Sequence, residues 1–78
     1  MNQNLFEMRL KALEKAGFKI RFETSYKDNH FTTYMVNDQG DVKILQSDVR
    51  GNGDINFQEI ILSSDIVNRL YEEVRKYR

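Results

Sequence analysis

The sequence predicts an α+β fold, a single small domain in which two helices flank a four-stranded antiparallel β-meander. Apolar residues recur with a helical period at both ends of the chain and with the alternating period of strands between them. Clusters of Gly, Asn and Asp divide the middle of the chain into short segments, and the sequence contains no Pro. A length of 78 residues fits one domain, residues 1–78.

The first helix is predicted at about residues 4–16. Its polar side chains fall opposite one broad apolar face, as expected of an amphipathic helix on a core. The apolar positions are Leu5, Phe6, Met8, Leu10, Ala12, Leu13 and Ala16. Gly17 follows directly and can end the helix in a left-handed conformation.

Four strands are predicted at about residues 18–25, 30–37, 41–48 and 54–62. In the first strand Phe18, Ile20 and Phe22 alternate with charged residues, which indicates one buried face. Polar turns at residues 26–29 and 38–41 separate the next strands. For residues 30–37 the pattern does not decide which face is buried.

The last helix is predicted at about residues 64–77. One stripe carries its apolar side chains, Ile66, Val67, Leu70, Tyr71, Val74 and Tyr77. Ser63 is a favourable N-cap residue. Since both helices have a single apolar stripe, the simplest arrangement packs both of them on one face of the sheet.

Residues 48–59, DVRGNGDINFQE, carry the one recognisable motif of the chain. Oxygen donors and a glycine stand at most of the positions that a calcium loop requires, so the stretch resembles the EF-hand family. The resemblance implies a cation held by Asp48, Asn52, Asp54, Asn56 and Glu59.

A hairpin accounts for the same residues better. Arg50 stands at the third position of the motif, where an oxygen ligand belongs, and the residues before the loop alternate as a strand. Asn52-Gly53 is typical of a type I′ turn between two strands. We therefore expect no metal here, with a degenerate calcium loop as a lesser alternative.

Composition argues against catalysis and cofactor binding. The chain has no Cys and a single histidine, His30, and it contains no phosphate-binding glycine motif or HExxH. So small a core also leaves little room for a catalytic pocket. We predict that the protein is not an enzyme and binds no cofactor.

The N-terminus lacks the pattern of a signal peptide, and no apolar run is long enough to span a membrane. A cytoplasmic location without membrane partners is therefore expected.

The sheet face away from the helices is the predicted binding surface. Aromatic and aliphatic side chains among charged ones are typical of such surfaces. The predicted residues are Lys19, Arg21, Glu23, Tyr34, Lys43 and Leu45.

The expected function is that of a protein-binding module: a small accessory or inhibitory protein that occupies a partner's surface. Proteins of this size and character are common among phage and mobile-element products, which would place it in the host cytoplasm.

Nucleic-acid binding through the same face is the main alternative. The order of elements is similar to that of double-stranded-RNA-binding domains. Tyr34 could stack on a base while Lys19, Arg21 and Lys43 contact phosphates. The second helix, however, starts with Ser63-Ser64-Asp65, and the net charge is zero, so the basic surface of those domains is missing. A neutral chain can also self-associate, which allows a homodimer.

Overall fold

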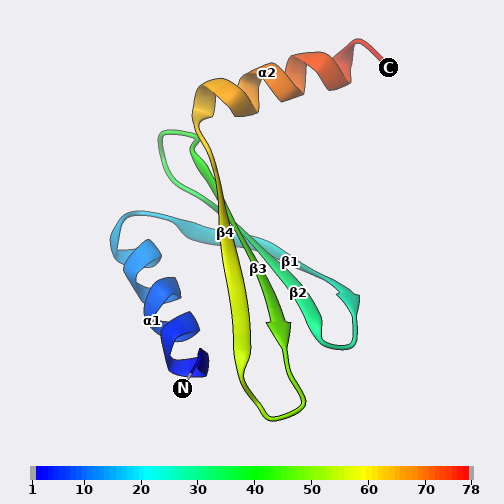
Figure 1. Cartoon of the computed structure of the whole chain (residues 1–78). Coiled ribbons are helices and arrows are strands. Elements are labelled where there is room, and N and C mark those ends of the chain that lie inside the picture. The colour runs from blue at the N-terminus through cyan, green and yellow to red at the C-terminus, as the bar shows by residue number, and fades with distance from the viewer. Residues whose placement is uncertain (1, 78) are drawn as a thin grey trace.

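The computed structural model describes residues 2–77 and confirms the predicted fold class (Figure 1). The elements, in chain order, are helix α1 (Asn2–Lys15), strands β1 (Lys19–Lys27), β2 (His30–Val36), β3 (Val42–Val49) and β4 (Ile55–Leu62), and helix α2 (Ser64–Arg75). The strands form one antiparallel sheet in the order β1-β2-β3-β4. Every predicted boundary lies within two residues of the observed one.

Gly17 ends α1 as predicted. It adopts a φ of 98°, which a residue without a Cβ reaches at no steric cost. Its N–H donates to the carbonyl of Glu14 at 3.1 Å, and that of Phe18 donates to the carbonyl of Leu13 at 3.0 Å. This Schellman motif brings the buried side chains of Leu13 and Phe18 together at the start of the sheet.

Helix α1 packs on one face of the sheet and forms the core. The buried apolar side chains come from α1, the residue before β1, and the two central strands: Leu13, Phe18, Met35 and Leu45. Phe6 and Leu10 of α1 and Phe57 of β4 pack around them. The rings of Phe6 and Phe57 meet edge to face at 5.5 Å between centroids, an arrangement that aromatic quadrupoles favour.

Helix α2 does not share this face, so the prediction that both helices pack on one face of the sheet is wrong. Figure 1 shows α2 leaving the end of β4 and projecting away from the strands. No residue of Ser64–Arg75 is buried. The helical period showed which side of α2 is apolar, but it carried no information about what covers that side.

Both hairpin loops around β3 have the same geometry. In residues 37–41 and 50–54 the first and last residues pair through a backbone hydrogen bond, and a glycine precedes the last residue. Gly40 and Gly53 have φ of 85° and 90°, whereas Asn52 does not have a positive φ. The loop at residues 50–54 is therefore a three-residue turn closed by a left-handed glycine. The hairpin prediction is confirmed, but the predicted type I′ turn is wrong.

Strand β1 departs from simple alternation. Ile20 pairs with Met35 and Phe22 with Tyr34, with a register shift between them. Because Met35 and Tyr34 point to opposite faces, Ile20 and Phe22 do too. The predicted single buried face through Phe18, Ile20 and Phe22 is therefore wrong: Phe22 lies on the side away from α1.

Candidate functional site: the open face of the sheet

The register assigns each strand residue to one of two faces, since successive side chains point to opposite sides. The face with Met35 and Leu45 lies under α1 and is called here the α1 face. No helix of residues 2–77 packs on the other side, called here the open face (Figure 1). Its side chains form four rows across the strands: Lys19, Val36, Val42 and Leu62; Phe22, Tyr34, Ile44 and Ile60; Thr24, Thr32, Gln46 and Gln58; and His30, Asp48 and Asn56.

The half of the open face nearer to α2 is apolar. The rings of Phe22 and Tyr34 stack at 4.4 Å between centroids, with an interplanar angle of 21°. Ile44 and Ile60 continue this row across β3 and β4. Phe22 and Ile60 remain exposed to solvent. An antiparallel sheet that simply faces water carries polar side chains there, so this half has the character of an uncovered contact surface.

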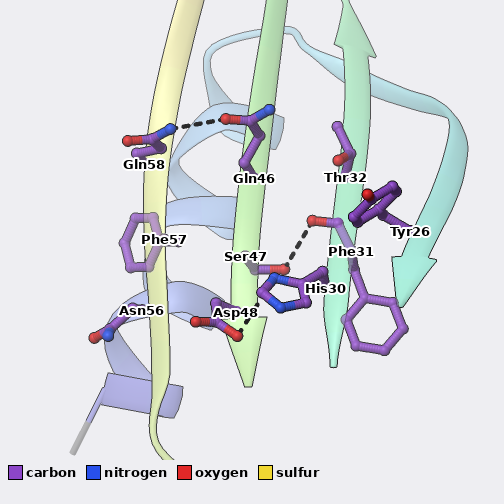
Figure 2. A pocket seen from close by; sticks show the side chains of 10 residues that line it. All are labelled: Tyr26, His30, Phe31, Thr32, Gln46, Ser47, Asp48, Asn56, Phe57 and Gln58. Carbon is purple, nitrogen blue, oxygen red and sulfur yellow. Dashed lines mark hydrogen bonds and ion pairs between the residues drawn. The ribbon is translucent and has the colours of Figure 1, made fainter. Parts of the chain in front are cut away.

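The other half is polar and hollowed. An open hollow of about 460 Å³ is lined by ten residues, which Figure 2 shows in a close-up: Tyr26, His30, Phe31, Thr32, Gln46, Ser47, Asp48, Asn56, Phe57 and Gln58. By the register, three of them, Phe31, Ser47 and Phe57, belong to the α1 face. Gln58 donates its Nε2–H to Oε1 of Gln46 at 2.8 Å. The amides of Gln46 and Gln58 and the hydroxyl of Thr32 can both donate and accept hydrogen bonds, and they carry no charge.

His30 and Asp48 lie close together within the hollow. Nδ1 of His30 lies 3.5 Å from Oδ1 of Asp48, and the two side chains are 47% and 45% exposed. The nearby hydroxyl of Ser47 donates instead to the carbonyl oxygen of Phe31 at 3.3 Å. The hydroxyl of Ser47 is therefore held by the backbone of β2.

The six residues predicted to form one binding face are divided by the sheet. Lys19 and Tyr34 belong to the open face, and Arg21 lies at the register shift of β1. The other three, Glu23, Lys43 and Leu45, belong to the α1 face. Leu45 is 0% exposed, so it cannot contact a partner.

The placement of Lys43 and Leu45 was wrong because a charged side chain points inward. Nζ of Lys43 lies 3.4 Å from Oε2 of Glu59 and 5.1 Å from the centroid of the Phe18 ring. A paired lysine whose stem packs on a ring can occupy an inner position. The alternation of Val42 and Ile44 with Lys43 and Leu45 therefore led to the wrong assignment of the covered face of this strand. Phe22, Ile44 and Ile60 of the open face were missed: the register shift in β1 reversed the side of Phe22, and Ile44 and Ile60 each stand next to another apolar residue.

Arg9 joins Lys43 and Glu59 in an ion cluster between α1 and the sheet. Nε and Nη2 of Arg9 donate to the two carboxylate oxygens of Glu59 at 2.6 and 2.9 Å. The hydrogen bonds from Arg9 hold the pKa of Glu59 below its ordinary value, although partial burial opposes this. The same hydrogen bonds raise the pKa of Arg9. Such a bidentate pair fixes orientation as well as charge.

The residues implied by the EF-hand resemblance do not converge. Glu59 points to the α1 face, where Arg9 holds it, whereas Asp48 and Asn56 point to the open face. Asn52 and Asp54 bond to each other within the turn: the Asn52 Oδ1 accepts from the Asp54 N–H at 3.0 Å. In residues 2–77 no cluster of three or more His, Cys, Asp or Glu could hold a metal ion. The motif shapes the β3–β4 hairpin.

The chain matches no protein-family model, no curated protein and no solved structure. Within the described residues no helix is long and apolar enough to cross a membrane.

Proposed function

We propose that this chain is a non-enzymatic protein-binding module. In this proposal it is a small accessory or inhibitory protein that acts in the cytoplasm by occupying a partner's surface with the open face. The observation that carries the proposal is the row formed by Phe22, Tyr34, Ile44 and Ile60, which spans all four strands on the side away from α1. An origin in a phage or mobile element stays a prediction.

The energetics of the apolar row support a contact with protein. Burying a large apolar side chain is worth roughly 1.5–3 kcal/mol, and aromatic anchors dominate many interfaces. Phe22 and Tyr34 are already stacked, so they lose little conformational freedom on binding. The polar half next to them offers uncharged amides and hydroxyls, which suit the backbone and polar side chains of a protein partner.

Nucleic-acid binding has less support. One of the groups proposed to act on RNA is engaged within the protein, since Lys43 pairs with Glu59 on the α1 face. The hollow also contains a carboxylate, Asp48, which would repel phosphate.

Adjacent residues of β4 allow a matched test of the open face. Ile60 lies on the open face and is 37% exposed, while Ile61 lies on the α1 face and is 63% exposed. Ile60→Lys and Ile61→Lys therefore add the same charge to the same strand on opposite sides. We expect Ile60→Lys to lower partner recovery from a lysate of the source organism about tenfold, which corresponds to the loss of one anchor, and Ile61→Lys to leave it unchanged.

Circular dichroism of both variants checks that the sheet is intact. Equal recovery by the two variants would show that the open face is not the binding surface. Recovery that disappears after nuclease treatment, or that falls steeply with salt, would support the nucleic-acid alternative.

A further inference from the structure

Helix α2 presents an apolar stripe that the rest of the described chain leaves uncovered. Ile66, Leu70, Tyr71 and Val74 are all exposed, with 52% of Leu70 accessible to solvent, and Tyr77 continues the stripe beyond the helix. The opposite side of the helix is charged or polar: Asp65, Asn68, Glu72 and Lys76. A surface helix of a globular protein normally buries such a stripe.

The exit from β4 holds α2 away from its own sheet. Ser63 alone separates β4 from α2, and its Oγ accepts from the N–H of Ile66 at 3.5 Å. The N–H of Ser64 donates to Oδ1 of Asp41 at 2.8 Å, so the start of the helix is fixed to the β2–β3 turn. Folding α2 back onto the open face would break this anchor within a one-residue connection.

The whole molecule has more surface than a compact monomer of its size. It exposes 6207 Å², whereas the size scaling of folded monomers gives about 5,000 Å². Its radius of gyration is 14.2 Å, against about 11.5 Å for a compact domain of this length. The excess area is on the order of 1,000 Å², comparable to the roughly 800 Å² that each partner buries in a standard interface.

The charges beside the stripe favour a second copy of the same helix. At 100° per residue, Arg69 and Glu73 lie along one border of the stripe, one turn apart. When two such helices pair antiparallel, equivalent borders face each other. Arg69 then lies beside Glu73 of the second copy, and Glu73 lies beside its Arg69. The spacing of Val67, Leu70, Val74 and Tyr77, at intervals of three and four residues, is that of a helix–helix seam.

We propose that α2 is a dimerisation helix that pairs antiparallel with α2 of a second copy of this chain. The pairing is isologous, since the same stripe serves both protomers. It buries Leu70 and Val74 of both chains and leaves both open faces accessible. The dimer therefore presents two binding surfaces, which would strengthen binding to a repeated or dimeric partner through avidity.

Sedimentation of the full chain over a range of concentrations tests the proposal. We expect a monomer–dimer equilibrium that Leu70→Asp shifts to monomer, because the pairing would bury the new carboxylate. Asn68→Asp adds the same charge on the polar side of the same helix and should leave the dimer intact. Circular dichroism reports whether α2 remains helical in both variants.

Charge exchange at Arg69 and Glu73 provides a second readout. Arg69→Glu or Glu73→Arg alone replaces two favourable contacts per dimer by two like-charge contacts, which should raise the dimer Kd about tenfold. The double variant restores opposite charges and should recover most of the affinity. A mixture of the two single variants separates this effect from the i,i+4 pair of Arg69 and Glu73 within one helix. In the mixed dimer each Glu faces an Arg of the other chain, so it should form more tightly than either single-variant dimer, which an effect within one helix would not give.

Several results would overturn the proposal. They are a monomer at every concentration, a Leu70→Asp variant that dimerises as tightly as the wild type, and a double variant no tighter than either single one. Loss of the dimer in Ile60→Lys but not in Leu70→Asp would place the contact on the open face instead. Binding of the monomer to anionic lipid vesicles through the same stripe, without a dimer, would likewise contradict it.

Discussion

Glu59 shows how one residue can connect distant parts of this chain. Its carboxylate receives two hydrogen bonds from Arg9, which is 50 residues away, and lies 3.4 Å from Nζ of Lys43. These contacts hold α1 against β3 and β4. Neither the helical pattern around Arg9 nor the alternation around Glu59 indicates that the two would meet. Glu59 is also the twelfth residue of the calcium-like motif, and here its carboxylate holds α1 against the sheet.

Replacement of Glu59 should destabilise the fold. Glu59→Gln keeps the shape but removes the charge that Arg9 and Lys43 share, and we expect the free energy of unfolding in urea to fall by about 1–3 kcal/mol. Glu14→Gln, at an exposed position of α1, is the matched control and should change stability little. Equal effects of the two substitutions would mean that the cluster does not stabilise the protein.

The same carboxylate gives stability a dependence on pH. The pKa of Glu59 lies below its ordinary value of 4.5 in the folded protein, so the unfolded chain binds the proton more readily. The contribution is thus fully present above pH 4.5 and is lost as pH falls through the folded pKa. The difference in unfolding free energy between wild type and Glu59→Gln should accordingly shrink as the buffer is acidified below that value. A difference that stays constant would contradict the assignment.

At the scale of elements, glycine position determines the geometry of the hairpins. Gly40 and Gly53 occupy equivalent places in the two loops around β3, and both have a positive φ. The sequence indicated where these turns occur, because Gly, Asn and Asp cluster there. It did not indicate the turn type, since the Asn52-Gly53 pair fits a two-residue loop as well as a three-residue one.

The two glycines of the β3–β4 loop should therefore respond differently to substitution. Gly53→Ala places a Cβ on a residue with a φ of 90° and should cost about 1–2 kcal/mol. Gly51→Ala is the matched control: its φ is not positive, and a Cβ there would meet nothing within 4 Å. It should be neutral or stabilising by up to about 1 kcal/mol. Equal losses in urea unfolding would contradict the loop geometry.

As a whole, the molecule is elongated and unevenly packed. It measures 45 × 29 × 16 Å, and its enclosed apolar core lies between α1 and the sheet. Helix α2 extends beyond this core (Figure 1). The protein thus combines a folded body, which presents the open face, with a helix whose apolar stripe the body does not cover.

Hydrogen exchange of the full chain should reveal this division. Amides of the central strand β3 should exchange slowest, because they lie in the ladder beside the buried Leu45. Amides of α2 should exchange fast in dilute solution and slow down as concentration rises and the dimer forms. Amides of α1 are the internal control and should not respond to concentration. Strong protection of α2 in dilute solution would contradict this description.

By itself, the sequence determined the elements, their order and their limits. Periods of 3.6 and 2 residues are local properties, and the glycines after α1 and in the turns interrupt them at the observed places. The tertiary structure decided which faces are covered. Lys43 and Glu59 could turn inward only because Arg9 meets them there, and the shift in β1 moved Phe22 to the open face. A local pattern shows that a face is apolar, but it cannot show what covers that face, because contacts between distant segments decide this.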